Sequence, residues 1–517
     1  MSIDAQVVVV GAGMGGLSAA IHLAVQGYKV HIFERQPQVG GKLNQIQMDG
    51  FHFDTGPSLI TMPAVFRGIF QSAGRRLEDY LDLQPLELTC RYFYRDGAIL
   101  NAWRDHERLA AEYARFNPAD GAAFWRFLEH VRIIYEASAG PFLFSSPGSP
   151  LQLLRTFARQ AQMSDGTPDS ASGKQHLREI FSALLAPNME QHVSHYFQDE
   201  HLRQLYARYA TYNGSSPYQV SGIYSIIPYV ELADGGWYPM GGIYAVAQAL
   251  EKLARELGVE ITTSCDVRRI LVEYGEARGV VLADGRVVRS ELVVANSDVV
   301  TTHLQLLSAS ATKPRYVRHL EHLEPSCSGF VLLLGVKKRY PELAHHNIFF
   351  SDNYPAEFED LFERKIPQRN PTIYICATSR TDPSQAPADH ENLFVLINAP
   401  YLTASSNWQR DAVPYREHIL DLLATYTQID LSDLREHIVS SAILTPEDFW
   451  QRYGSNAGSI YGLSSNSRLA PFVRPGNRST QVRNLYFVGG STHPGGGVPL
   501  VLLSGKIVSA LIVEDAG

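Results

Sequence analysis

The stretch VVVVGAGMGGLSAA, residues 7–20, joins a run of four valines to a glycine-rich turn. A continuous β-branched run of this kind is typical of a parallel strand that is buried on both faces. The glycines follow at the spacing G-x-G-x-x-G, and a helix is expected over 15–26. The first glycine permits a tight turn, the second lets a pyrophosphate approach the backbone, and the third lets the helix pack on the strand. Phosphates would lie at the helix N-terminus. The glycines predicted to contact them are Gly11, Gly13, Gly15 and Gly16.

A second strand and an acidic residue follow at the expected distance. Residues 28–33 are predicted to form this strand, which ends at Glu34, about 20 residues past the glycines. The Glu34 carboxylate can accept hydrogen bonds from ribose hydroxyls, and its charge argues against a 2′-phosphate. Together these features predict a dinucleotide site. The alternative is a glycine turn in a βαβ unit that binds no ligand.

A further glycine-rich segment follows the acidic residue. VGGK spans 39–42 and FHFDTGPS spans 51–58. An enzyme that uses a nicotinamide dinucleotide has no obvious need for such a segment, whereas a flavoprotein must hold an isoalloxazine ring far from its adenine. The segment therefore favours FAD over NAD.

The pattern E-R-x-x-x-x-G-G-K, followed by F-D-T-G-P-S, resembles the flavin-binding amine oxidase and phytoene desaturase superfamily. The resemblance implies that FAD lies extended across the domain, with Glu34 at the adenosine ribose. It also implies that the backbone near Val267 meets the adenine. The other residues assigned to FAD in this part are Arg35 next to the ribose acid, Gly41 and Lys42 near the pyrophosphate, and Gly56, Pro57 and Ser58 near the flavin.

The C-terminal stretch NLYFVGGSTHPGGGVPLVLLSGK, residues 484–506, repeats the order of strand, glycines and helix. The strand is expected over 485–488 and the helix over 498–512. The helix N-terminus would direct its free N–H groups and positive dipole end at the reduced flavin. G-x-x-x-H-P-G-x-G-V-P closely resembles the carotenoid desaturases of the bacterial phytoene desaturase type, although GGST replaces the Gly-Asp of many flavoproteins. The residues assigned to FAD here are Gly490, Ser491, Gly497 and Val498.

Two internal motifs, GGWYPMGG at 235–242 and GSIYG at 458–462, support the resemblance to these carotenoid desaturases. At GGWYPMGG the pattern of the nucleotide-binding domain resumes after a long interruption. The predicted fold class is α/β: a Rossmann-type FAD-binding domain with an inserted α+β substrate domain and a helical membrane-facing part. The FAD-binding domain is predicted to comprise 1–62, 235–297 and 455–517, and the substrate domain 63–234 and 298–454. The expected elements are a helix over 243–257, a strand over 259–263, a hairpin over 279–288, a strand over 292–295, a mostly helical stretch over 63–227 and an exposed loop over 164–173.

The composition sets outer limits. The net charge of −8 gives no reason to expect a nucleic acid partner. The four cysteines lie far apart without a C-x-x-C, so neither a disulfide scaffold nor a metal site is indicated. The N-terminus lacks the features of a secretory signal, and no apolar stretch approaches ~18 residues. We therefore expect a cytoplasmic protein without a membrane span.

Three residues are candidates for moving a proton. His493 stands in the glycine-rich turn, where its alternative role is to brace the turn through hydrogen bonds. Glu231 and Asp234 precede GGWYP, and the alternative for both is a solvated turn or a helix cap. The sequence does not select a base among them.

The reaction implied by the resemblance removes two hydrogens across a carbon–carbon single bond beside a polyene. FAD would accept a hydride, and conjugated double bonds would spread the remaining charge before a proton is lost. The resemblance leaves open phytoene, a C30 diapo-carotenoid or a 1-hydroxycarotenoid as substrate, and oxygen or a membrane quinone as electron acceptor. The alternatives are oxidation of a terminal methyl group, isomerisation with reduced FAD, and an amine oxidase.

A carotenoid or related polyene is dissolved in the bilayer, so we expect this protein to contact a membrane surface peripherally. The stretch 124–157 is the candidate for that contact; its alternative is a helix pair buried in the second domain. A long apolar tunnel would hold the substrate. The candidates for its aromatic lining are residues 92–94, 124–125, 142–144 and 224–229. The alternative for each is an ordinary place in the protein core.

Overall fold

The computed structural model describes residues 6–139, 143, 182–183, 186–467, 470 and 474–516. The predicted loop over 164–173 and most of the candidate membrane stretch beyond residue 139, with Phe142 and Phe144, lie outside the described residues.

A five-stranded parallel sheet forms the first layer, with strand order β19-β13-β1-β2-β9. Three predicted strands are confirmed at its centre, because Val7–Val10, residues 29–33 and residues 292–295 all belong to it. The bounds are β1 (Gln6–Val10), β2 (Lys29–Phe33), β9 (Glu260–Thr262), β13 (Leu292–Ala295) and β19 (Leu485–Phe487).

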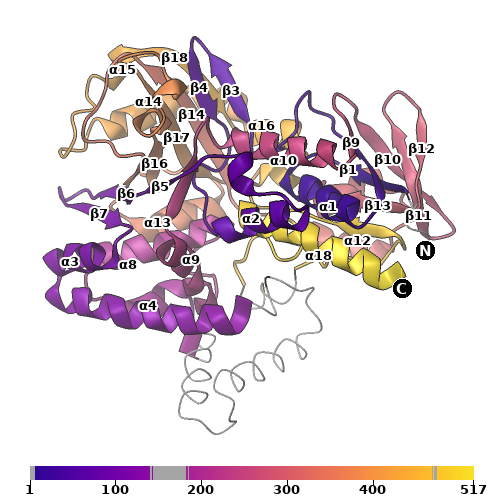
Figure 1. Ribbon diagram of the computed structural model, residues 1–517. Coiled ribbons are helices and arrows are strands. Elements are labelled where there is room, and N and C mark those ends of the chain that lie inside the picture. Colours follow the sequence, from indigo (N-terminus) through magenta and orange to yellow (C-terminus); the bar gives the residue numbers. More distant parts are fainter. Residues whose placement is uncertain are drawn as a thin grey trace, which may run out of the picture.

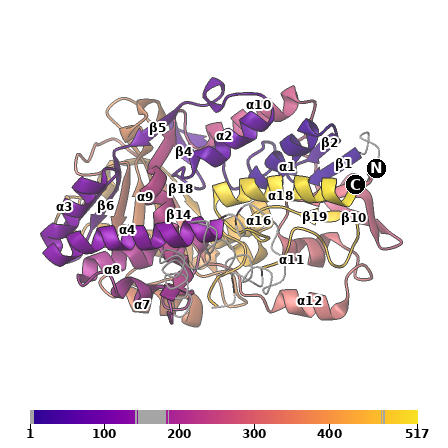
Figure 2. The ribbon, with the colours of Figure 1, turned by 60° about the horizontal axis from the view of Figure 1, so that its bottom comes forward.

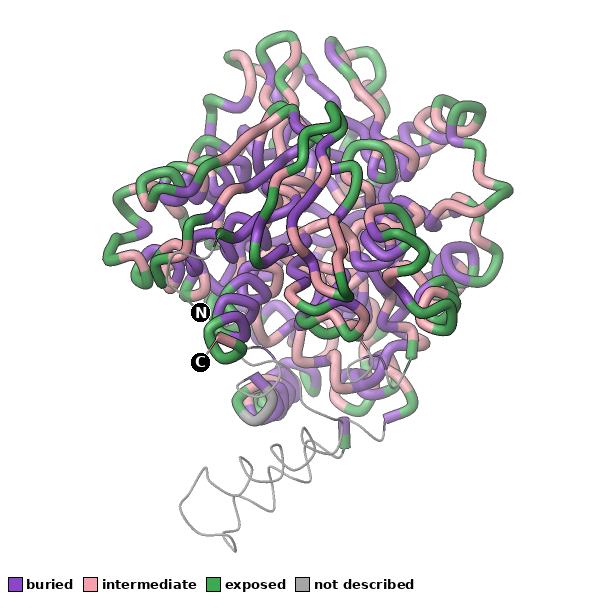
Figure 3. The backbone as a smooth tube through the Cα atoms, turned by 90° about the vertical axis from the view of Figure 1, so that its right-hand side faces the viewer, coloured by how far each residue is buried: buried purple, intermediate pink, exposed green. Residues whose placement is uncertain are grey.

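Both faces of this sheet are buried, as the valine run predicts. Val7 and Val9 pack with the helices on one face, whereas Val8 and Val10 pack with a three-stranded antiparallel sheet, β10-β11-β12, on the other. This alternation follows from the two-residue period of a strand. Figure 3 shows buried segments running through the interior and exposed segments in the outer loops. The bounds are α1 (Met14–Val25), α10 (Tyr244–Glu256), β10 (Val267–Glu273), β11 (Glu276–Leu282) and β12 (Val287–Arg289).

The glycine turn between β1 and α1 has the geometry that the motif predicts. Gly11 has a φ of +97°, a conformation that glycine adopts without strain. A Cβ on Gly16 would lie 2.2 Å from the carbonyl oxygen of Gly11, so only glycine lets the helix approach the strand this closely.

The C-terminal helix α18 (Val498–Ala516) lies against α1, as Figures 1 and 2 both show. The hydroxyl of Ser18 donates a hydrogen bond to the carbonyl of Leu502 at 2.7 Å, and a Cβ on Gly505 would lie 2.5 Å from the backbone nitrogen of Ala19. The two ends of the chain therefore form one structural unit, and both termini lie at the same side of the molecule (Figure 1).

A seven-stranded mixed sheet forms the second layer, with strand order β18-β14-β17-β16-β15-β6-β7. The expectation that 63–227 is mostly helical is incorrect for 83–103, which forms three strands. Two of them join this sheet; Tyr92 on β6, for example, pairs in parallel register with Ile348 on β15. The bounds are β5 (Leu83–Leu86), β6 (Leu88–Phe93), β7 (Ile99–Trp103), β14 (Ser328–Val336), β15 (His346–Phe349), β16 (Ile373–Cys376), β17 (Glu391–Ala399) and β18 (Ile438–Leu444).

Helices cover this second layer. Trp408 and Ile419 of α14 pack on Phe330 and Val395 of the sheet, whereas aromatic residues of α3, α4 and α8 form a separate core around Tyr92. Among the described residues, no helix is long and apolar enough to cross a bilayer. The bounds are α2 (Pro63–Ser72), α3 (His106–Phe116), α4 (Pro118–Ser138), α7 (Met189–Ser194), α8 (Glu200–Ala207), α9 (Ile227–Asp234), α11 (Val299–Thr301), α12 (Pro314–Glu321), α13 (Tyr354–Phe358), α14 (Trp408–Leu423), α15 (Leu434–His437) and α16 (Pro446–Tyr453), with the hairpin β3 (Gln45–Met48) and β4 (Phe51–Asp54) and the strand β8 (Gly236–Pro239).

Candidate functional site

One cavity of about 720 Å³ runs from the carboxyl ends of the parallel strands into the second layer. Val10, Phe33, Asn296 and Val488, which end or directly follow β1, β2, β13 and β19, line its first part. Parallel α/β sheets bind ligands at this edge. The opposite part is lined by apolar side chains of the second sheet and its surroundings: Val331, Ile348, Phe394, Leu396 and Phe449.

Most of the residues that the sequence assigns to FAD meet in this cavity, although they come from both ends of the chain and its middle. Gly15 and Gly16 do not line it, because they lie behind the turn, against Gly489 and Gly11. The assigned residues that line the cavity are Gly11, Gly13, Glu34, Arg35, Gly41, Lys42, Gly56, Pro57, Ser58, Val267, Gly490, Ser491, Gly497 and Val498.

Glu34 connects the end of β2 to the glycine turn. Its carboxylate accepts hydrogen bonds from the backbone N–H groups of Ala12, at 2.7 Å, and Gln36, at 2.8 Å. Burial raises the pKa of Glu34, and these backbone donors oppose that rise. The carboxylate is therefore held in a fixed orientation at the cavity wall.

Lys42 connects the second glycine segment to the GSIYG motif. Its ammonium group donates to the carbonyls of Ser459, at 3.0 Å, and Ile460, at 2.9 Å. Burial lowers the pKa of Lys42 to about 8, and the nearby Asp298 carboxylate opposes that change. Lys42 thus holds the 458–462 segment beside the cavity, a contact that its sequence position alone does not reveal.

The C-terminal turn is braced from two sides. Ser491 accepts a hydrogen bond from the backbone of Val299 at 2.9 Å, and the Gly490 carbonyl accepts one from the Arg474 guanidinium at 2.9 Å. Gly497 has a φ of +103°, and a Cβ there would meet no atom within 4 Å. The turn therefore leaves open space directly before the N-terminus of α18.

Asn296 is a residue of this site that sequence reasoning did not identify. Its side chain lies beside Gly11, Gly13 and Gly489, and its amide donates to the Val488 carbonyl. It follows β13, which lies between β1 and β19 in the sheet. The only local signal was its position after a buried strand.

The three candidates for proton transfer occupy different environments. His493 is buried outside the cavity lining; its backbone N–H donates to Pro475 at 3.0 Å, and its carbonyl accepts from Asn477 at 2.8 Å. Asp234 is exposed at the end of α9 and does not line the cavity. Glu231 is buried and lines it.

Where they are described, the aromatic side chains proposed for a tunnel do not line the cavity, and Trp125 is exposed. Tyr92, Phe93, Tyr94 and Phe124 are buried but do not line the cavity. The aromatic side chains that line it are Phe33, Tyr212, Tyr354, Tyr374, Phe394, Phe449, Tyr453 and Tyr461. Several of these lie within residues 354–453, a region for which the sequence offered no motif, whereas Tyr461 belongs to the GSIYG motif.

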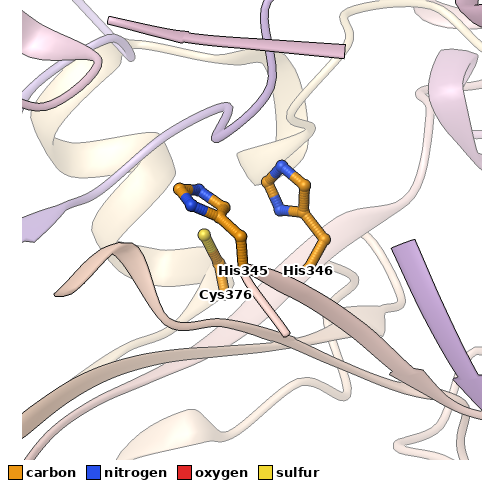
Figure 4. Close-up of side chains that lie close together, drawn as sticks. All are labelled: His345, His346 and Cys376. Carbon is orange, nitrogen blue, oxygen red and sulfur yellow. The ribbon is translucent and has the colours of Figure 1, made fainter. Parts of the chain in front are cut away.

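A buried group of His345, His346 and Cys376 lies beside the cavity, and Figure 4 shows the three side chains on the same side of β15 and β16. Their potential metal-ligating atoms lie within 4.8 Å of one another. His345 shares a hydrogen bond with Thr381 at 2.6 Å, and His346 with Tyr374 at 2.7 Å. Burial lowers the pKa of His345 to about 3 and raises that of the Cys376 thiol. Sequence spacing missed this group because strand pairing creates it.

Comparison with known proteins identifies close relatives over the full chain. The family model described as flavin containing amine oxidoreductase matches residues 14–513. A 4,4'-diapolycopene oxygenase of Methylomonas sp is 39% identical over 99% of this chain and 98% of its own length. A zeta-carotene-forming phytoene desaturase of Myxococcus xanthus is 37% identical over 99% of this chain and 94% of its own length. A 4,4'-diaponeurosporene oxygenase of Staphylococcus aureus (strain MSSA476) is 33% identical over 97% of each.

Solved structures share the fold at lower identity. Putrescine oxidase bound to putrescine matches with a TM-score of 0.61 and 15% identity, covering 99% of both chains. Cyclohexylamine oxidase from Brevibacterium oxydans matches with a TM-score of 0.58 and 18% identity, again over 99% of both. At this identity the likeness concerns the fold alone.

Proposed function

Because this chain belongs to the flavin-containing amine oxidoreductase family, whose members bind FAD, we propose that it is an FAD-dependent carotenoid desaturase. It introduces carbon–carbon double bonds into a long polyene hydrocarbon. One observation carries the proposal: the nucleotide-binding loops and an apolar wall share a single cavity. An apolar substrate can therefore lie against the cofactor without leaving the interior.

The cavity residues fit FAD. Glu34 would hold the adenosine ribose and the backbone at Val267 the adenine, while Gly13, Gly41 and Lys42 lie where the pyrophosphate would pass. The open space at Gly497 suits a planar ring system, because no side chain fills it. Bound FAD supplies a two-electron oxidant that accepts a hydride. The proposed flavin-end residues are Gly56, Pro57, Ser58, Gly490, Ser491, Gly497 and Val498.

The protein contributes alignment, water exclusion and electrostatics. Val331, Ile348 and Phe394 give the polyene an apolar surface, so the substrate gains by leaving water. The N-terminus of α18 faces the cavity at Val498, and its positive dipole end favours negative charge there.

A second candidate activity is oxidation of a terminal methyl group of the carotenoid. The relatives named as oxygenases favour it, at 39% and 33% identity, whereas the relative named as a desaturase is 37% identical. Buried polar groups in the cavity, Arg208 and Glu231, also favour a substrate or product that carries oxygen.

Expression in cells that accumulate phytoene, diapophytoene or diapolycopene separates these activities. A desaturase yields products that lose two hydrogens per step and absorb at longer wavelength; a terminal oxygenase yields products that gain oxygen. A chain carrying Glu34→Gln serves as the control for cofactor-dependent conversion. Unchanged carotenoids with a flavin-loaded protein would contradict the proposal.

We further propose that the protein docks on a membrane surface to collect its substrate and that oxygen or a quinone reoxidises the flavin. The apolar substrate requires a route from the bilayer. Flotation with liposomes tests the docking, and anaerobic turnover with and without a soluble quinone tests the acceptor.

The division into an FAD-binding domain (1–62, 235–297, 455–517) and a substrate domain (63–234, 298–454) is part of the same proposal. All five strands of the parallel sheet come from the ranges of the FAD-binding domain.

A further inference from the structure

Two buried charged side chains, Arg208 and Glu231, lie in the wall of the cavity. Arg208 follows α8, lines the cavity and is only 7% exposed. One terminal nitrogen donates to the hydroxyl of Tyr92 at 2.9 Å. Its Nε is buried and has no hydrogen-bond partner. The guanidinium is therefore only partly satisfied by the protein.

Aromatic rings surround this guanidinium. Its central carbon lies 5.4 Å from the ring centre of Tyr92, 4.4 Å from that of Tyr209 and 5.1 Å from that of Tyr212. Such contacts stabilise a desolvated cation and fix its plane. We call Arg208, Tyr92, Tyr209, Tyr212 and Glu231 the arginine pocket.

Glu231 completes the arginine pocket without pairing directly with the arginine. The hydroxyls of Tyr209 and Tyr212 donate to its two carboxylate oxygens, each at 2.7 Å. Within the part of the chain that the structure describes, no ion pair joins Glu231 to Arg208. The phenols thus occupy the carboxylate, and Tyr212 also interacts with Arg208. The guanidinium still has an unpaired donor, its Nε.

A pure hydrocarbon offers no acceptor to a buried guanidinium. Burying a charge without hydrogen bonds costs several kcal/mol, so buried polar groups are nearly always paired. We propose that the arginine pocket binds an oxygen atom at one end of the polyene, as in an aldehyde or carboxylate. Guanidinium only donates hydrogen bonds, so the ligand atom must be an acceptor.

This inference rests on the proposed function, because it assumes a carotenoid ligand, and it deepens the second candidate activity: the arginine pocket would hold the oxidised end of the substrate or product. The arginine pocket opens to the same cavity as the turn at Gly496 and Gly497. A polyene anchored at the arginine pocket therefore remains in the cavity that holds the cofactor-binding residues.

Binding measurements on the FAD-loaded protein test the proposal. The two probes are a C30 carotenoid with aldehyde ends and a hydrocarbon of the same conjugated length, each titrated in detergent and followed by its visible spectrum. We expect the aldehyde to bind at least about tenfold more tightly, which corresponds to ~1.4 kcal/mol. Equal affinity for the two probes would overturn the proposal.

Variants assign the preference to the arginine pocket. Arg208→Met alone leaves the Glu231 carboxylate buried without its compensating cation, so the double variant Arg208→Met/Glu231→Gln removes both charges together. In the double variant the affinity ratio of aldehyde to hydrocarbon is expected to fall to near one. Arg208→Lys keeps the charge but loses the planar fork, and its ratio should lie between those of the wild type and the double variant.

Arg108→Met is the matched control, because Arg108 is exposed, stacks on Trp103 at 3.6 Å and lies outside the cavity lining. If the folded double variant still prefers the aldehyde to the hydrocarbon, the assignment of that preference to the arginine pocket is overturned. If the double variant does not fold, an affinity ratio in Arg208→Lys equal to that of the wild type overturns the assignment. Failure of the proposed function has a different signature: the wild type then binds neither probe.

Discussion

The side-chain amide of Asn296 donates a hydrogen bond to the backbone carbonyl of Val488, at an Nδ2–O distance of 3.2 Å. This contact joins the end of the central strand β13 to the C-terminal glycine motif. Because Asn296 also lies against the N-terminal glycines, one side chain fixes the spacing between both motifs.

Asn296→Ala should therefore loosen both glycine loops. We expect the free energy of unfolding to fall by ~1–3 kcal/mol, since a hydrogen bond and its packing are lost, and the FAD content of the purified protein to fall with it. Thermal unfolding and the flavin absorbance per chain measure the two effects. Full flavin content with unchanged stability would contradict the role given to Asn296.

Gly16→Ala should prevent α1 from packing on β1, because the new Cβ would lie 2.2 Å from the Gly11 carbonyl oxygen. We expect mostly insoluble or flavin-free protein. Gly68→Ala is the matched control: Gly68 lies in α2, and a Cβ there meets nothing within 4 Å. This control should leave stability unchanged or raise it by up to ~1 kcal/mol. Similar behaviour of the two variants would contradict the close-packing argument.

Glu34→Gln should weaken FAD binding. The variant keeps the size of the side chain but loses the charge that strengthens the hydrogen bond from Ala12 and the proposed hydrogen bonds from ribose hydroxyls. Such bonds contribute ~1.5–3 kcal/mol, so the Kd for FAD should rise about tenfold or more. Titration of apoprotein with FAD, followed by flavin fluorescence, gives the Kd. Glu260→Gln, at an exposed site on β9 of the same sheet, should not change it.

Asp54→Asn should change how stability depends on pH. Both oxygens of Asp54 accept from the backbone N–H of Ile243 at 3.0 Å, and burial raises the pKa of Asp54 from 3.8 to about 7. Between these values the folded state holds a proton that the unfolded state has lost. Stability therefore falls as pH rises through this window, by up to ~1.4 kcal/mol per pH unit.

The variant has no titrating group at position 54, so its free energy of unfolding should decline less than that of the wild type between about pH 5 and about pH 7. Urea unfolding at both pH values provides the comparison. Parallel pH profiles for the two proteins would show that Asp54 is not the group responsible.

The four cysteines should be unreactive in the folded protein. All are free and buried, and burial raises the pKa of Cys90 and of Cys327 to about 12. The thiolate is the reactive form, so a disulfide-exchange reagent should modify no thiol rapidly until denaturant is added, and then all four. Rapid modification of a native thiol would show that its site opens to solvent.

Local sequence patterns predicted the parallel sheet well because its strands are marked by features within a few residues. The run Val7–Val10, the glycine turn and the buried strand over 292–295 all depend on neighbouring residues. The strands over 83–103 were missed because they are short and mixed in polarity. Their partners stand far away; Tyr92 pairs with Ile348.

The sequence by itself determined the dinucleotide motif and the family, since glycine spacing and strand burial are local constraints, and it predicted residues from both ends of the chain that would contact FAD. Only the tertiary structure placed Glu231 in the cavity and Asp234 at the surface, although they stand three residues apart. It also brought Arg208 and Asn296 to the cavity wall. The reason is physical: burial, charge pairing and cavity shape depend on packing between distant segments, which no local spacing records.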